Sequence, residues 1–437
     1  MALHSQEPRR LMPAGEATTV PADAGANGVG AARSWLDALA KPTAFVALLG
    51  YPLTLTSPGA TVAMILVGLY GLALALRDGL PEDLRRVHRS MLACYLLVVV
   101  VDVLNGGGWA NFESAGNYLV LLALAPYANA LRRLHISPAI LDWTIAATLL
   151  LATALSCFQM WVFVEARPGG FHLASVGYGV VVSMLATLLF SRALQYGDHW
   201  RWWLFVSAAA FIPVLLSGSK IAIACIMIGF FVVSVIWAKQ NDRWRAWVLG
   251  GVAAGCAFSI AFYWLAFYRL QALIYELKYL YINGQPINES FGSRYQMNEI
   301  GVKTFLHKPV LGYGLAERMS AFRAEAGGGA AFVDVPYIHS DYVTHLVAFG
   351  IFGLVFLLLY LFLIYRLSNR SGEVAYRRAG LAIIAMLTIY MAADVAFNMD
   401  PIGAVLTLVL GAVLSRAPAE RVAAADGAVD GKSTKPD

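Results

Sequence analysis

The sequence predicts an all-α polytopic membrane protein with about twelve transmembrane helices and one large polar loop. Hydrophobic residues make up 59% of the chain and charged residues 14%, whereas soluble domains carry roughly 25% charged residues. Many runs of about 17–25 apolar residues are long enough to cross a ~30 Å hydrocarbon core as helices. One polar stretch, residues 268–341, interrupts these runs. A water-exposed globule is excluded.

The candidate spans follow one another along the chain with short polar connections. Pro52 interrupts the first of them, which makes its pattern the weakest. In chain order, the spans are Pro42–Thr56, Ala60–Leu76, Ser90–Leu104, Asn117–Leu131, Leu141–Val164, Leu173–Leu194, Trp202–Leu216, Ile221–Trp237, Ala246–Phe267, Tyr342–Tyr365, Ala379–Ala396 and Ile402–Leu414.

Two tails flank this transmembrane domain of residues 35–415. Residues 1–34 are rich in Ala, Gly and Pro and contain no apolar run of the kind that a signal peptide needs. Residues 416–437 have a similar composition. Both tails are therefore interpreted as disordered and cytoplasmic.

The distribution of Lys and Arg between the connections predicts the orientation. Connections that follow even-numbered spans are rich in basic residues, whereas 56–58, 105–116 and 398–401 have none. Because cytoplasmic loops are enriched in Lys and Arg, both termini are predicted to be cytoplasmic and the loop 268–341 periplasmic. This distribution is more informative than the formal net charge of +5, and no nucleic-acid partner is expected.

Two short outer connections break the charge pattern, because each holds one basic residue. These are Arg167 and Lys220. Each is either an anchor that extends to the membrane surface or, together with Arg294 in the long loop, a cation that faces an anionic group. Both interpretations stay open.

The long loop has its own predicted structure. From Ser293 to Leu306, apolar residues recur at near-helical spacing among charged ones, and Pro309 ends the run. This pattern predicts an amphipathic helix on the membrane surface or over the bundle. Gly312-Tyr313-Gly314 predicts a tight turn, and Gly327-Gly328-Gly329 a flexible tip.

The chemistry that this loop could support is limited to cations and one histidine. The sequence has no Walker-type loop, no H-E-x-x-H, no paired-Cys spacing and no D-x-D pair in an outer loop, so neither a metal nor a cofactor is expected. Arginine binds phosphate oxygens bidentately, and His339 could act as a base near neutral pH. His339 could equally be solvated or cap a helix. Asp341 could orient its ring, but capping the next helix is favoured.

The order of these features resembles the O-antigen ligase and polymerase superfamily of bacterial envelope glycosyltransferases. The likeness is carried by about twelve spans and an outer loop in which G-S-R-Y (292–295) precedes an amphipathic helix. H-K-P-V-L-G-Y-G (307–314) and H-S-D-Y (339–342) follow, and the next span contains F-G-I-F-G-L (349–354). The resemblance to this superfamily is best over residues 221–359.

The resemblance implies a C-type glycosyltransferase fold in the bacterial inner membrane. It also implies metal-independent, inverting transfer of a glycan from undecaprenyl diphosphate to a sugar hydroxyl at the periplasmic face. The acceptor would be lipid A core for a ligase, or another lipid-linked glycan for a polymerase; neither is favoured.

The resemblance also implies roles for individual residues. Arg294 matches the family's loop arginine and His339 its catalytic histidine. Lys220 stands where many members have arginine, so a point charge would replace a bidentate contact with the diphosphate. Arg167 resembles a further outer arginine.

Two other classes of protein compete with this interpretation. A lipid-linked oligosaccharide flippase or other transporter would carry ionisable residues deep in several spans and broken helices near the midplane. Here Asp102 and Asp394 are near the outer ends of their spans, which favours chemistry at the surface. A non-catalytic assembly factor is the third option.

Overall fold

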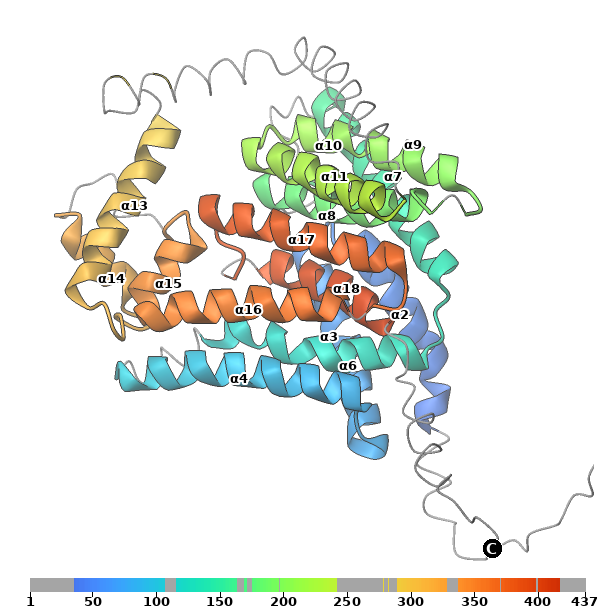
Figure 1. Cartoon of the computed structure of the whole chain (residues 1–437), viewed down its shortest axis with the longest axis horizontal. Coiled ribbons are helices and arrows are strands. Elements are labelled where there is room, and N and C mark those ends of the chain that lie inside the picture. The colour runs from blue at the N-terminus through green and yellow to red at the C-terminus, as the bar shows by residue number, and fades with distance from the viewer. Residues whose placement is uncertain are drawn as a thin grey trace, which may run out of the picture. The chain divides into compact units, whose positions relative to one another are not determined.

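The structure is a computed structural model, and all of its regular elements in the described part of the chain are helices (Figure 1). It describes residues 35–106, 115–162, 169–170, 175–195, 197–241, 278, 282, 289–327, 337–369, 371–397 and 400–416. The predicted tails and the ninth predicted span, 246–267, fall outside these ranges, apart from Arg416. The prediction of an all-α polytopic membrane protein is confirmed.

Seven helices in the described residues are long and apolar enough to cross a membrane. They are α3 (Ser57–Asp78), α4 (Glu82–Leu104), α7 (Pro138–Val162), α8 (Ser175–Ala193), α11 (Lys220–Gln240), α16 (Ile351–Asn369) and α17 (Val374–Ala393). The shorter ones among the bundle helices are α2 (Ala40–Leu53), α6 (Val120–Arg133) after the 3₁₀ turn η1 (Gly116–Tyr118), α9 (Trp200–Ala209), α10 (Phe211–Leu216) and α18 (Asp400–Ser415). The chain is thus a multi-pass membrane protein, and its total of about twelve spans stays a prediction.

Two predicted spans are each divided into two helices. The span 202–216 becomes α9 and α10, which meet at Ala210. Pro213 explains the break, because a proline has no N–H to donate to the carbonyl of Ala209. The span 342–365 becomes α15 (Asp341–Phe349) and α16, separated by Gly350 with φ +61°. A left-handed residue cannot continue an α-helix, so α15 ends there.

The bundle is organised around α8. Residues 177–191 of this helix are all buried, and α11 and α17 pack against it. Close approach depends on small residues: a Cβ on Gly229 of α11 would lie 2.3 Å from Oγ1 of Thr187. By contrast, α4 and α16 expose apolar side chains such as Val103 and Leu358, as expected for helices that face lipid.

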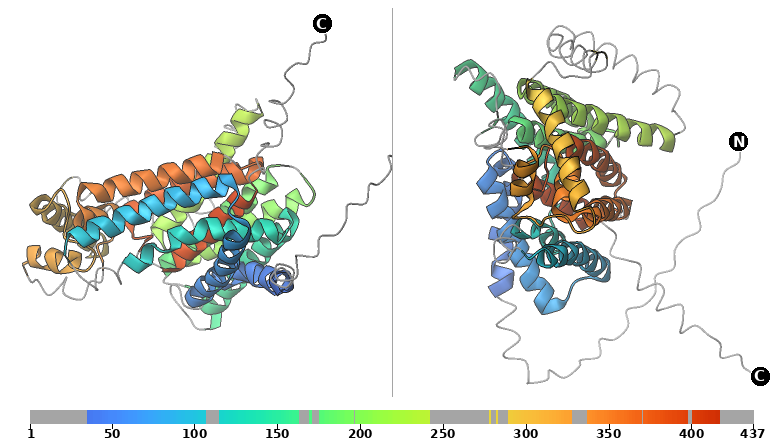
Figure 2. Two further views of the ribbon diagram at one scale, coloured as in Figure 1. Left: turned by 90° about the horizontal axis from the view of Figure 1, so that it is seen from below. Right: turned by 90° about the vertical axis from the view of Figure 1, so that its left-hand side faces the viewer.

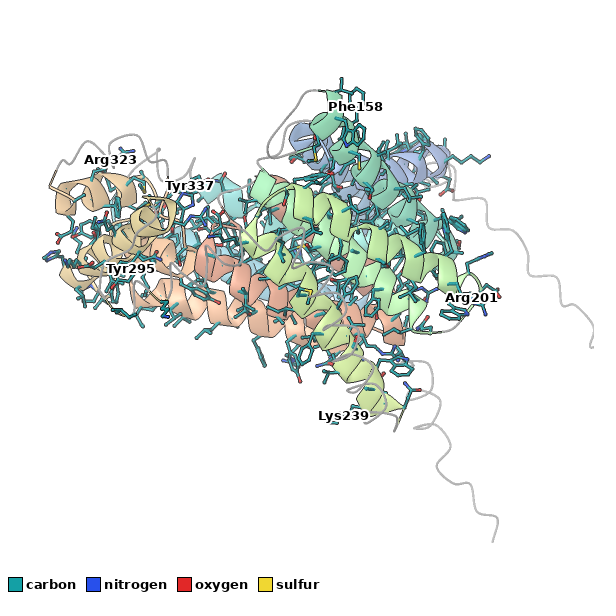
Figure 3. The ribbon with its side chains drawn as sticks, turned by 90° about the horizontal axis from the view of Figure 1, so that it is seen from above. Phe158, Arg201, Lys239, Tyr295, Arg323 and Tyr337 are labelled. Carbon is teal, nitrogen blue, oxygen red and sulfur yellow. The ribbon has the colours of Figure 1, made fainter. Side chains whose placement is uncertain are left out.

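The two ends of the bundle differ in chemistry. At one end, α13 (Glu289–His307), α14 (Arg318–Glu325) and α15 lie together (Figures 1 and 2). The label Tyr337 lies near this end in Figure 3, whereas Arg201 and Lys239 lie at the far end. The far end also holds the ion pair of Arg192 with Asp142, at 2.7 Å between Nε and Oδ2. Basic connections therefore gather away from the long loop, as the charge pattern predicts; which end is cytoplasmic stays a prediction.

Candidate active site

The loop segment 309–314 fastens the long loop to the corner between α15 and α16. The N–H of Tyr313 donates to the carbonyl of Val347 at 2.9 Å, and that of Gly314 to Ala348 at 2.8 Å. On the other side of Gly350, the N–H of Ile351 donates to the carbonyl of Pro309 at 2.9 Å. We call this arrangement of residues 309–314 on residues 347–351 the clamp.

Glycines make the clamp possible. Gly312 has φ +70°, and a Cβ there would lie 2.6 Å from the carbonyl carbon of Ala348. A Cβ on Gly350 would lie 2.3 Å from the carbonyl oxygen of Val310. Glycine adopts positive φ without steric cost, so the two backbones can touch. The predicted turn at 312–314 is therefore part of a docking surface.

The C-terminal end of α4 contacts the backbone of the clamp and of Leu315, which follows it. Oδ1 of Asp102 accepts the N–H of Leu315 at 2.7 Å, and Nδ2 of Asn105 donates to the carbonyl of Leu311 at 2.8 Å. Asp102 is buried. Its carboxylate thus serves as a fixed acceptor for loop backbone.

His339 pairs with an aspartate from another helix. Its Nδ1 lies 3.3 Å from Oδ1 of Asp394, at the C-terminal end of α17. The His339 side chain is 24% exposed and that of Asp394 only 2%. Oδ1 of Asp394 also accepts the N–H of Val395 at 3.0 Å, which fixes the carboxylate. A proton on Nδ1 shared with Asp394 would leave Nε2 as the basic nitrogen.

Tyr337 contacts His339 and is influenced by the charge of Arg294. The rings of Tyr337 and His339 meet edge-on, with centroids 5.0 Å apart. Burial and the charge of Asp394 raise the pKa of Tyr337, while the nearby cation Arg294 of α13 lowers it. Arg294 is partly buried. The structure therefore brings Arg294 and His339, 45 positions apart in the sequence, to the same tyrosine. Tyr337 thus contacts His339 and lies within electrostatic range of Arg294, which groups the three as a candidate site.

Asp341 fixes the turn that carries Asp394. The N-cap of α15 is Ser340, whose Oγ accepts the N–H of Val343 at 3.4 Å. The capping role predicted for Asp341 is therefore wrong. Oδ2 of Asp341 accepts the N–H of Ala396 at 2.5 Å, and its own N–H donates to the carbonyl of Asp394 at 3.2 Å. Burial raises the pKa of Asp341 to about 8, against the opposing effect of the backbone N–H groups of Ala396 and Phe397.

A buried polar layer lies beneath these residues, and sequence reasoning missed it. Oη of Tyr118 lies 2.9 Å from Nε2 of His345, whose Nδ1 lies 2.7 Å from the carbonyl of Asp341. Arg318 of α14 donates to the carbonyl of Leu315 at 2.5 Å and acts electrostatically on Asp102, Tyr118 and Asp341. Burial lowers the pKa of Arg318. A signal was present for Asp394 and Asp102, because acidic residues at the ends of apolar spans are uncommon without a role.

The other two predicted cations have less structural support. Lys220 is the first residue of α11 and is exposed, and Oγ of Ser219 caps that helix by accepting the N–H of Ala222 at 3.2 Å. Helix α11 packs along α17, which ends at Asp394. Arg167 lies outside the described residues. Diphosphate binding by either residue stays a prediction.

Metal ligands do not gather anywhere in the part of the chain that the structure describes. Among those residues, no three His, Cys, Asp or Glu side chains are placed to hold a metal ion. The site, as far as it is described, consists of a histidine–aspartate pair, a tyrosine and an arginine. Such a set suits proton transfer beside an anionic group.

Comparison with protein families decides the assignment. Residues 204–358 match the family described as O-antigen ligase. Over this range the chain is similar to the O-antigen ligase family. This confirms the predicted resemblance to the O-antigen ligase and polymerase superfamily. The matched range contains Lys220, Arg294 and His339, whereas Asp394 lies beyond it.

Similarity to the O-antigen ligase family indicates the general activity. Members of the family are glycosyltransferase-like enzymes of the ligase or polymerase type, and a membrane protein of this kind acts on glycans at a lipid bilayer. Comparison with curated protein sequences gives no match.

Proposed function

We propose that this protein transfers a glycan from an undecaprenyl-diphosphate carrier to a sugar hydroxyl at the periplasmic face of the bacterial inner membrane. The observation that supports this most directly is the pairing of His339 with buried Asp394 beside Tyr337 and Arg294. A base and a cation in one site are what displacement of a diphosphate by a hydroxyl requires.

His339 would act as the general base. Its Nε2 would take the proton of the acceptor hydroxyl while the oxygen bonds to the anomeric carbon of the donor and the bond to the diphosphate breaks. Asp394 would stabilise the imidazolium through Nδ1, as a buried carboxylate does in other base–carboxylate pairs. A single displacement of this kind inverts the anomeric centre and needs no metal ion.

Arg294 would bind the leaving group. As the donor bond breaks, negative charge grows on the diphosphate oxygen, and a guanidinium can hold two phosphate oxygens at once. Lys220 and Arg167 would add charge to the same leaving group. The products are the extended glycan, undecaprenyl diphosphate and a proton, which His339 returns to water.

An apolar cavity next to the site supports a lipid-linked donor. It has a volume of about 400 Å³ and lies between α3, α6, α16, α17 and α18. Met391 and Phe397, which precede and follow Asp394 by three residues, both line it. A polyprenyl chain bound there would end close to the histidine–aspartate pair. The acceptor would be lipid A core or a second lipid-linked glycan.

A transporter is less well supported by the described helices. The break at Gly350 lies where the clamp holds the long loop, whereas alternating access uses broken helices at the midplane. Asp102 and Asp394 are two acidic residues that a transporter could use within its spans. The carboxylate of Asp102 accepts a hydrogen bond from the backbone N–H of Leu315.

Transfer in liposomes containing a lipid-linked glycan and an acceptor tests the proposal. His339→Ala should lower the rate by about 10²–10⁴-fold, the usual contribution of a general base. The matched control is His307→Ala, which removes an exposed histidine paired with Glu325 at 3.0 Å and should leave the rate unchanged. Full activity of the His339→Ala protein would refute the assignment.

Two further measurements test metal independence and the choice between ligase and polymerase. Loss of transfer in EDTA that Mg²⁺ or Mn²⁺ restores would contradict metal independence. A deletion strain that accumulates full-length lipid-linked polymer with bare lipid A core indicates a ligase, and one limited to single repeats indicates a polymerase.

A further inference from the structure

A second cavity lies at the far end of the bundle from His339, where α4 packs against α16. Its volume is about 330 Å³. Three arginines line it: Arg86 and Arg89 from the start of α4, and Arg366 from the last turn of α16. All three are exposed. Figure 1 shows the two helices side by side, which brings cations from distant parts of the chain together.

The floor of this cavity is apolar. Val87, Met91 and Leu367 are buried, and Leu363 is partly buried beside them. Ser90 adds a hydroxyl to the lining. A site for a free inorganic anion would need polar walls on most sides, because desolvating the ion must be offset by hydrogen bonds. Cations around an apolar floor suit an amphipathic ligand instead.

The three arginines around this cavity carry more positive charge than the neighbouring Glu82 can neutralise. Nε of Arg86 lies 3.0 Å from Oε1 of Glu82, and Nη1 of Arg85 lies 3.3 Å from Oε2 of the same carboxylate. Glu82 is therefore shared by two arginines. The guanidinium of Arg366 lies 5.9 Å from the ring centre of Phe362, one turn earlier.

The neighbouring sequence indicates that the cavity lies close to the boundary between membrane and water. From Ser90 to Leu104, α4 is almost entirely apolar, a length of about 22 Å at 1.5 Å per residue. Phe362 and Tyr365, next to Arg366 on α16, are 52% and 49% exposed. Exposed aromatic residues near the end of an apolar helix are typical of the membrane interface.

We propose that this cavity binds the headgroup of an anionic phospholipid in the leaflet opposite the α13–α15 end. The guanidinium groups of Arg86, Arg89 and Arg366 would hold the phosphate oxygens. The upper part of the acyl chains would lie on Leu363 and Met91 and along the exposed face of α16. The site is independent of glycan transfer, because none of its residues reaches His339 or Arg294.

Native mass spectrometry of the purified full-length protein tests this site. Phosphatidylglycerol and phosphatidylcholine are the probes, and R86Q/R89Q/R366Q is the test variant. The control, R133Q/R201Q/K239Q, removes the same charge from other basic connections. We expect the wild type and the control to retain phosphatidylglycerol in preference to phosphatidylcholine. The test variant should bind it about a hundredfold more weakly, as three interfacial arginines predict.

Other outcomes would overturn the proposal. Equal loss in both triple variants would mean an unspecific charge effect, and equal retention of phosphatidylcholine would mean that the phosphate is recognised without regard to net charge. Competition by millimolar inorganic phosphate would indicate a site for a soluble anion. If the triple variant does not fold, R366Q alone should weaken phosphatidylglycerol binding about fivefold, and an unchanged affinity would refute the site.

Discussion

The clamp and the segment 337–341, which carries His339, lie next to each other. The clamp is held by backbone groups, whereas the segment 337–341 is held mainly by side chains. The clamp works through backbone: three N–H groups donate to carbonyls across the α15–α16 corner, and glycines permit the contact. The segment 337–341 works through side chains, with His339 on Asp394 and Asp341 on Ala396. The clamp therefore positions the loop, and the segment 337–341 carries the residues to which we assign the chemistry. Substitutions should separate the two, since damage to the clamp changes folding and damage to the site changes rate.

The largest effect is expected for Asp394→Asn. The amide keeps the shape of the side chain but cannot stabilise an imidazolium, so transfer should fall on the order of 10³-fold. The apparent Tm should change little. Asp78→Asn, at the opposite end of the bundle, serves as the control for charge. A transfer rate close to that of the wild type in the D394N protein would mean that Asp394 only shapes the turn.

A substitution in the clamp should act on stability. Gly312→Val places a branched side chain at φ +70° and within 2.6 Å of the Ala348 backbone. We expect a loss of roughly 2–4 kcal/mol, typical of strain at a special φ combined with a steric clash, measured as the shift in apparent Tm in detergent. The matched control is Gly106→Val, also at positive φ but with open space around a Cβ. Equal shifts in the two variants would show that φ strain, and not docking, sets the cost.

Asp341 gives a smaller and pH-dependent effect. Its unfolded pKa is about 3.9, and burial raises the folded pKa to about 8. Folding then favours the protonated acid, so this contribution to stability is complete below about pH 3.9 and is lost as pH rises through about 8. The contribution of Asp341 should therefore lower the wild-type Tm between about pH 4 and pH 8 and change it no further above that range. Asp341→Asn should flatten that slope, and an unchanged slope would mean that other groups cause it.

The sequence predicted most of the helices because their signals are local. Apolar length gave the spans, and near-helical spacing before Pro309 gave α13, which runs from Glu289 to His307. The division at Gly350 was not predicted, because an F-G-I-F-G-L run is as apolar as an unbroken span. Only the clamp, which reaches Gly350 from a remote segment, requires a left-handed residue there.

The residues of the candidate site could be singled out from the sequence only in part, for the same physical reason. His339 and Arg294 stand in recognisable local patterns, whereas Asp394 is 55 residues from its histidine and ends a different helix. Arg318 was missed because α14 is mostly polar in sequence, with only Phe322 fully buried. Its burial against Leu315 arises from tertiary packing. Sequence patterns reveal residues that are close along the chain. The residues of the polar layer beneath the site are mostly far apart in sequence and are brought together by folding.

Gly350 has a consequence for motion. A glycine between two helices is an obvious place for a hinge, yet clamp bonds attach on both sides of it, at Val347 and Ala348 before it and at Ile351 after it. Bending at this corner would break the clamp bonds on at least one side of Gly350. The clamp therefore holds the corner and the loop segment 309–314 together with the start of α16. Gly350 is thus a fixed corner held from both sides, and its positive φ serves docking of the loop and not a hinge.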